Sequence, residues 1–111
     1  MADVNARDPA NQRTSLWLAA AKGKLDEAKA LIAKKADPNI PDKYGNTALI
    51  QASSRGDAAM VRFLVEHHAD VTAVNTAGDK TALGVAQGAE VRTYLDNAIK
   101  SVGLVSKLFA C

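Results

Sequence analysis

Apolar residues recur along the chain in short bursts with helical spacing. The first burst is made of Leu16, Ala19 and Ala20, and the second of Leu25, Ala28, Leu31 and Ile32. Spacings of three and four residues place such side chains on one face of a helix. The pattern therefore predicts two short helices that follow one another closely.

The same pattern returns at a fixed distance. Thr14 and Thr47, Gly23 and Gly56, and Asp37 and Asp70 are all 33 residues apart. A third copy starts in register but gains one residue near Asp79-Lys80 and is shortened after Ala86. Residues 2–8 match residues 36–42 and read as the tail of an earlier copy. The chain thus holds two full units between partial ones.

Capping and turn residues mark the ends of the predicted helices. Thr14, Thr47 and Thr81 each precede an apolar burst, where a hydroxyl can accept from the free amides of a first turn. Gly23 and Gly56 separate the two bursts of a unit, where a left-handed residue can end the first helix. Residues 42–46 and 75–79 carry turn chemistry and predict hairpin-like projections.

These units resemble the ankyrin repeat, which opens its first helix with T-P-L-H-x-A-A and ends near G-A-D-x-N. The matching stretches here are Thr14–Ala20, Thr47–Ser53 and Thr81–Ala86, with Ala36-Asp37-Pro38-Asn39 and Ala69-Asp70-Val71-Thr72 at the ends. The resemblance implies an all-α solenoid of stacked helix-turn-helix units. The expected divisions are a partial repeat at 1–13, repeats at 14–41 and 42–74, a shortened repeat at 75–95 and a C-terminal capping helix at 96–111.

The chain departs from the family pattern at the histidine. Trp17, Ile50 and Gly84 stand in its place, and no copy keeps the proline. In the family this histidine makes a hydrogen bond that ties units together. We therefore expect apolar packing to do more of the tying here, and modest stability.

A further helical stripe follows the repeats, made of Val91, Leu95, Ala98, Val102, Val105 and Phe109. It predicts a helix that caps the open end of the stack. Self-association through this helix is the alternative, although Gly103 interrupts the run.

Composition narrows the class of protein. The chain has 111 residues, a net charge of +2 and a single cysteine, Cys111, so no internal disulfide can form. Its polar start is not a secretory signal, and no stretch is apolar enough to cross a membrane. These features predict a cytoplasmic protein, with the nucleus as the other expected location.

Candidate chemistry is sparse. His67 and His68 are adjacent, and neighbours on a helix point about 100° apart, so they cannot easily share a metal ion. Neither a phosphate-binding loop nor a nucleophile elbow is present. We therefore expect no metal, no cofactor and no enzymatic activity.

The family resemblance implies that a partner lies against the turn tips and the exposed face of the first helices. Carried over by position, the partner-binding residues are Arg13, Lys22, Lys43, Tyr44, Asn46, Ser54, Arg55, Thr76, Asp79 and Lys80. Most of the charged ones are basic, which predicts an adaptor or small regulator that binds an acidic protein segment. Two alternatives remain: a binder of nucleic acid or another anionic surface, disfavoured by the balanced charge, and a part of a larger repeat protein.

Overall fold

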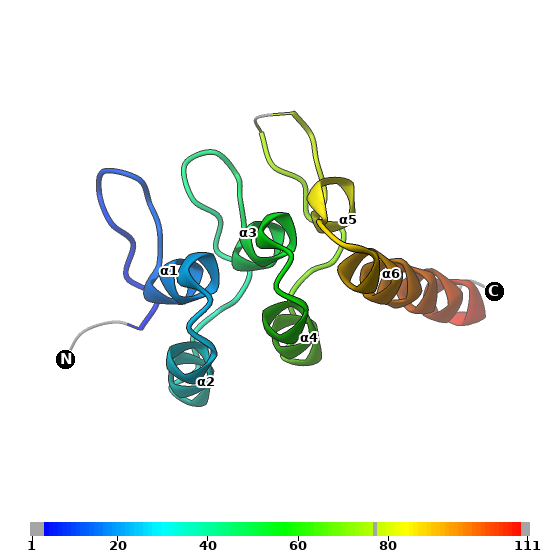
Figure 1. Cartoon of the computed structure of the whole chain (residues 1–111), viewed down its shortest axis with the longest axis horizontal. Coiled ribbons are helices and arrows are strands. Elements are labelled where there is room, and N and C mark those ends of the chain that lie inside the picture. The colour runs from blue at the N-terminus through cyan, green and yellow to red at the C-terminus, as the bar shows by residue number, and fades with distance from the viewer. Residues whose placement is uncertain (1–3, 77, 110–111) are drawn as a thin grey trace.

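The computed structural model describes residues 4–76 and 78–109, with side-chain environments up to Ser101. Its helices are α1 (Ser15–Lys22), α2 (Leu25–Ala33), α3 (Ala48–Arg55), α4 (Ala58–Glu66), α5 (Ala82–Val85) and α6 (Ala89–Phe109), and the described residues form no strand. The inner helices α1, α3 and α5 form one row, with α3 in contact with the other two (Figure 1). Outer helices α2 and α4 lie beneath that row, and loops project from its other side. The predicted all-α solenoid is confirmed.

The inner helices α1, α3 and α5 begin, and α1 and α3 end, where the capping residues predict. The hydroxyl of Thr14 accepts a hydrogen bond from the Trp17 N–H at 3.1 Å, and Thr47 and Thr81 cap α3 and α5 in the same way. Gly23 and Gly56 end α1 and α3 in the left-handed conformation. This backbone state favours glycine because a side chain is strained there.

The core is one continuous layer between the two rows of helices. Its largest fully buried side chains include Leu16, Leu49, Met60, Leu64 and Leu95. The small residues Ala19, Ala20, Ala52 and Ser53 are also buried, which allows α1 and α3 to approach closely. Each inner helix therefore completes the core of its neighbour, as expected for units that cannot bury their apolar faces alone.

Three loops carry matching hydrogen bonds, and we call them loop 1 (8–13), loop 2 (42–46) and loop 3 (75–80). In each loop, the backbone N–H of the first residue donates a hydrogen bond to the carbonyl of the last residue. The N···O distance is 2.9 Å in loop 2 and 3.0 Å in the other two loops. Adjacent loops are also joined. The Lys43 N–H donates to the Asn11 carbonyl at 3.0 Å, and the Thr76 N–H donates to the Tyr44 carbonyl at 2.9 Å. The extra residue predicted near Asp79 lies within loop 3, which is one residue longer than loop 2.

Asparagine side chains join the repeats on the opposite edge. Asn5 Oδ1 accepts from the Asp37 N–H at 2.7 Å, and Asn39 Oδ1 accepts from the Asp70 N–H at 2.7 Å. The equivalent of these residues in the next unit is Thr72, whose hydroxyl instead donates to Asp70 Oδ1 at 2.6 Å. This row of asparagines therefore ends at Thr72.

The last helix is longer than the pattern of repeats suggests. α6 runs without a break from Ala89 to Phe109 and passes through Gly103, so the expected division at 95/96 falls inside one helix. Ala98 and Ile99 pack on the core, and the capping of the stack by this part of the chain stays a prediction. The side chains of Val102, Val105 and Phe109 lie outside the described environments, as does Cys111.

One expectation about the missing histidine is wrong. At the Trp17 position the hydrogen bond between units is kept, because the indole Nε1–H donates to the Asn46 carbonyl at 2.9 Å. Trp17 is only 4% exposed, so it contributes both apolar packing and a polar link from α1 to loop 2. Ile50 and Gly84 carry no side-chain donor, and at these positions the expectation holds.

Candidate functional site

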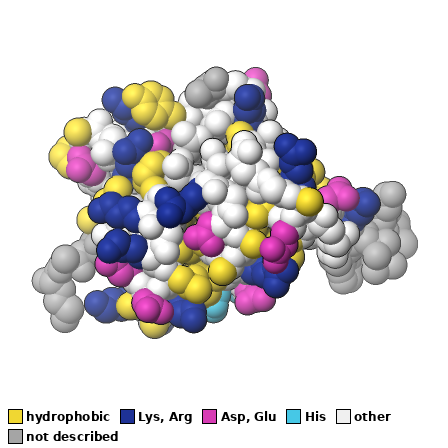
Figure 2. Space-filling model, in the orientation of Figure 1, with side chains coloured by type: hydrophobic (Ala, Val, Ile, Leu, Met, Phe, Trp, Pro, Cys, Tyr) yellow, Lys and Arg dark blue, Asp and Glu magenta, His cyan; other side chains and the backbone are white. Residues whose placement is uncertain are grey.

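The loops and the outward positions of the inner helices form one surface, which we call the binding face. Lys and Arg side chains gather over α1 and α3 in Figure 2. Leu18, Gln51 and Val85 occupy equivalent positions of α1, α3 and α5, and Leu18 remains 38% exposed. The binding face therefore offers both apolar contact and positive charge.

Arg13 is held by an aromatic ring and by a buried carboxylate. Its guanidinium lies over the Trp17 ring, with Cζ 4.1 Å from the ring centroid. Its Nε is 3.5 Å from Asp42 Oδ2, and the Asp42 side chain is fully buried. The two atoms form a close ion pair without hydrogen-bond geometry. The other carboxylate oxygen, Oδ1, accepts from the backbone N–H groups of Tyr44 and Asn46 at 2.9 and 3.0 Å.

Tyr44 stands at the tip of loop 2 with its ring in solvent. It is 47% exposed, and Lys43 Nζ lies 5.1 Å from the ring centroid. Its backbone is fixed, because the carbonyl also accepts from the Thr76 hydroxyl at 2.8 Å. An exposed aromatic ring on a fixed loop is well suited to contact a partner.

Several residues predicted to bind a partner also form hydrogen bonds within the chain. Arg55 Nη1 donates to the Ala21 carbonyl at 3.1 Å and so satisfies the end of α1 in the preceding unit. Asn46 uses its side chain to link to Asn75 Nδ2 at 2.9 Å. Thr76 uses both its N–H and its hydroxyl on Tyr44. These three residues hold neighbouring units together.

The remaining predicted residues are exposed. Lys22 and Ser54 lie near the ends of α1 and α3, while Asp79 and Lys80 lie in loop 3. Asp79 adopts a left-handed φ of 51° within the lengthened loop. Of the ten predicted residues, Arg13, Lys43 and Tyr44 are brought together by the loop 1–loop 2 contact, whereas Lys80 and Asp79 lie one loop further along.

Two exposed apolar residues were missed by the sequence reasoning. Leu18 lies on α1 between buried Trp17 and Ala19, and Val74 immediately precedes loop 3 and is 51% exposed. The signal for Leu18 was available, since it is the variable position of the T-x-L-x-x-A-A pattern and its equivalents are Gln51 and Val85. A leucine at a position that also accepts glutamine indicates a surface residue.

The structure offers no second centre of chemistry among the residues it describes. No group of three or more His, Cys, Asp or Glu side chains is placed to hold a metal ion within residues 4–76 and 78–109. His67 ends α4 and its ring lies 4.6 Å from that of Phe63, while His68 takes a left-handed φ of 75°. Both histidines are exposed at the helix end, as expected for a surface pair.

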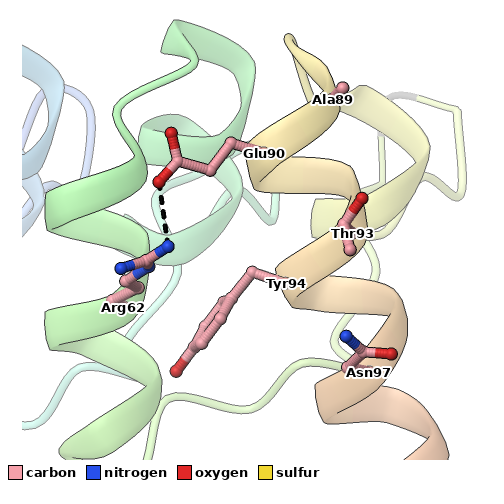
Figure 3. Close-up of a pocket in the computed structure, with 6 residues that line it drawn as sticks. All are labelled: Arg62, Ala89, Glu90, Thr93, Tyr94 and Asn97. Carbon is pink, nitrogen blue, oxygen red and sulfur yellow. Dashed lines mark hydrogen bonds and ion pairs between the residues drawn. The ribbon is translucent and has the colours of Figure 1, made fainter.

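A groove of about 450 Å³ lies between α4 and α6 (Figure 3). Arg62 pairs with Glu90 across it at 2.8 Å, and the Tyr94 ring lies beside Arg62. The pKa of Tyr94 is raised, mainly by partial burial and to a smaller extent by the nearby Glu66 carboxylate. The phenol is therefore protonated at neutral pH. The Arg62–Glu90 pair and the Tyr94 ring thus form part of the lining of this groove.

Comparison with known proteins agrees with this architecture. The model of the family described as "Ankyrin repeats (3 copies)" matches residues 1–75. The ankyrin repeat domain of Bcl-3, described as a unique member of the IkappaB protein family, superposes with a TM-score of 0.82 and 33% identity. That match covers 86% of this chain and 41% of the other.

Curated relatives share the repeats within much longer proteins. Human ankyrin repeat and SOCS box protein 6 is 36% identical over 85 residues, which are 70% of this chain and 20% of that protein. Human ankyrin repeat domain-containing protein 39 is 47% identical over 51 residues, or 46% of this chain and 28% of its own length. Palmitoyltransferase akr1 of Schizosaccharomyces pombe is 46% identical over 61 residues, only 10% of its length. The chain therefore spans a small part of each relative.

Across the described part of the chain, no helix combines the length and the apolar character needed to cross a membrane.

Proposed function

The chain belongs to the ankyrin-repeat family, and we propose that it acts as an adaptor or small regulator that binds an acidic, partly apolar segment of another protein on its binding face. Ankyrin repeats are a protein–protein interaction module. The observation that carries the finer proposal is the exposure of Leu18 and Tyr44 together with Lys22 and Lys43, two lysines that form no ion pair with an acidic residue in the described part of the chain.

The available positive charge supports an acidic partner. Among the described residues, the ion pairs join Arg13 to Asp42, Arg62 to Glu90 and Lys100 to Asp96. Lys22 and Lys43 take part in none of them and are exposed on the binding face. Unpaired cations on one surface attract an acidic segment and raise its rate of association.

Apolar contact supplies the part of the affinity that charge cannot. Exposed ion pairs contribute little at physiological salt, typically below about 1 kcal/mol each. Burying an aromatic or leucine side chain at the centre of an interface contributes more, typically about 2 kcal/mol or more at a hot spot. Tyr44 and Leu18 are the residues of the binding face that can be buried in this way.

A peptide selection tests the proposal. Twelve-residue peptides are selected from a displayed random library against the whole chain, and their binding rates are measured at two salt concentrations. We expect acidic peptides with at least one large apolar residue. The Lys22→Glu/Lys43→Glu variant should lower their association rate by roughly tenfold, with a smaller change in dissociation.

The choice of variants follows from the contacts. Arg55 donates a hydrogen bond to the end of α1, so its replacement would change the stability of the chain as well as its affinity for a peptide. Lys22 and Lys43 are exposed, and in the described residues their side chains make no hydrogen bond. Lys29→Glu/Lys34→Glu is the matched control, because it changes the net charge equally at exposed positions on and after α2. Selection of neutral peptides, or equal effects of the two variants, contradicts the proposal. Displacement of the peptides by a single-stranded oligonucleotide, with a steep dependence on salt, would favour the nucleic-acid alternative.

A further inference from the structure

Arg13 differs from the lysines of the binding face because its position is fixed before any partner arrives. Its N–H donates to Asn11 Oδ1 at 3.0 Å, and its carbonyl accepts from the Asp8 N–H at 3.0 Å. One face of its guanidinium lies on Trp17, which is itself fixed by the bond to Asn46. Backbone and side chain are therefore both constrained.

The outer edge of this guanidinium is free. A guanidinium carries five N–H donors, and the Nε edge of Arg13 faces Asp42. The terminal Nη groups have no hydrogen-bond partner among the described residues, and the side chain is 32% exposed. By contrast, Arg7, Arg55 and Arg62 each use a terminal nitrogen for a bond within the chain.

The buried carboxylate of Asp42 orients Arg13 without using its terminal donors. Asp42 Oδ1 is occupied by two backbone N–H groups, and Oδ2 lies 3.5 Å from Arg13 Nε with no hydrogen bond of its own. The ion pair thus holds the inner edge toward loop 2. The opposite edge presents two parallel N–H donors, the geometry that matches a carboxylate.

We propose that Arg13 is the specificity-determining residue of the binding face and forms a two-point hydrogen bond with one Asp or Glu side chain of the partner. This inference rests on the proposed function and deepens it, because it fixes where along the surface the acidic residue must lie. Less rotamer freedom is lost on binding when the arginine is already held, so the contact is stronger than one made by a mobile lysine.

The equivalent positions of the other loops sharpen the assignment. Loops 2 and 3 carry Asn46 and Lys80 where loop 1 carries Arg13. Asn46 has no charge and is bonded to Asn75, and Lys80 is a flexible point charge. Of the three equivalent positions, only that of Arg13 therefore offers a guanidinium with two parallel N–H donors. Leu18, on the same α1 as Trp17, is exposed, so the acidic residue should have an apolar neighbour.

The test uses a selected acidic peptide, the whole chain and its Arg13→Lys variant. Lysine keeps the charge but loses the planar pair of donors, so we expect the affinity to fall by about tenfold. Each acidic residue of the peptide is replaced in turn by its amide, and at one position we expect a loss of affinity about as large as that of Arg13→Lys. When this peptide is combined with the Arg13→Lys chain, the two losses of affinity should not add, since both changes remove the same contact. Lys80→Gln, the control in loop 3, should change affinity by less than about threefold.

A measurement on the unaltered chain guards against a variant that folds poorly. The Nε–Hε signal of Arg13 in a nitrogen-15 NMR spectrum should shift on addition of the peptide and not on addition of its amide form. An Arg13→Lys chain that binds within twofold of the original, or an unmoved Arg13 signal, overturns the inference. In that case Lys22→Glu/Lys43→Glu still tests the proposed function separately. If no acidic peptide is selected, the proposed function and this inference fail together.

Discussion

Replacing Trp17 with phenylalanine tests the link between α1 and loop 2. Phenylalanine keeps a buried ring beneath Arg13 but has no N–H to donate to the Asn46 carbonyl, now bonded at 2.9 Å. The lost hydrogen bond should cost about 1 kcal/mol. The smaller ring in a site that is 4% exposed should add about 1 kcal/mol more. We therefore expect the free energy of unfolding to fall by about 2 kcal/mol.

Urea unfolding followed by far-ultraviolet circular dichroism measures this change without relying on the removed tryptophan. The midpoint should fall while the slope stays the same, because the surface exposed on unfolding changes little. For a chain of this size, 2 kcal/mol corresponds to a melting temperature lower by roughly 8 °C. Ile50→Val is the matched control, since Ile50 occupies the equivalent position, is 3% exposed and makes no side-chain hydrogen bond. It should cost about 1 kcal/mol.

A second readout examines the bond directly in the original chain. The indole N–H of Trp17 should exchange with solvent far more slowly than a free indole, because exchange requires α1 and loop 2 to separate. Rapid exchange, together with equal losses for Trp17→Phe and Ile50→Val, would show that the hydrogen bond does not hold the repeats together in solution.

Three further changes address other joints between units. Asn39→Ala removes bonds to the Asp70 N–H and the His68 carbonyl. It should lower the free energy of unfolding by about 1 to 2 kcal/mol in urea denaturation, and a loss below about 0.5 kcal/mol would contradict the role of this row. Gly45→Ala places a Cβ 2.8 Å from the Thr76 nitrogen, whereas the control Gly88→Ala has the same left-handed strain and meets nothing within 4 Å. Gly45→Ala should therefore lower the free energy of unfolding clearly more than Gly88→Ala. Equal losses of stability would show that loops 2 and 3 are not in contact. Hydrogen bonds from Thr72 lower the pKa of Asp70; the hydroxyl has the larger effect and the backbone N–H the smaller one. The stability that Asp70 contributes is therefore present above its unfolded pKa of about 3.9 and is lost as the pH falls through the folded pKa. Thr72→Val should raise that pKa toward its usual value in an NMR titration and reduce the loss of stability in acid, and an unchanged pKa would exclude the hydroxyl as its main cause.

The fold could be predicted because its determinants are local and repeated. Thr14, Thr47 and Thr81 cap helices wherever a hydroxyl precedes an apolar burst, and Gly23 and Gly56 end helices for a reason that belongs to the residue itself. The 33-residue step then places the units in register without knowledge of any contact. The length of α6 was less accessible, because the same helical stripe continues on both sides of position 95 and nothing in the pattern marks a division.

The candidate site could be predicted only as a surface. Exposure of Lys43 and Tyr44 follows from their place in a turn, but the roles of Arg55 and Asn46 depend on partners in neighbouring units, 34 and 29 residues away. The sequence alone indicates that Arg55 is a free surface cation, and only the structure shows that it donates a hydrogen bond to the carbonyl of Ala21. Long side chains near the junction of two repeats can thus turn inward to satisfy a helix end or a loop, and periodicity alone does not show which of them do so.

The contrast between Arg13 and Arg55 shows what stacking adds to a repeated sequence. Both are arginines next to the inner helices, and both contact a neighbouring unit. Arg55 uses a terminal nitrogen for that contact. Arg13 uses its Nε edge, and its terminal nitrogens have no hydrogen-bond partner among the described residues. The difference arises because Trp17 and Asp42 lie on either side of Arg13, one beneath its plane and one at its inner edge. The replacement of the family histidine by Trp17 therefore adds a polar link between α1 and loop 2 and places a ring beneath the Arg13 guanidinium. In our proposal, the same ring orients the arginine that selects the partner.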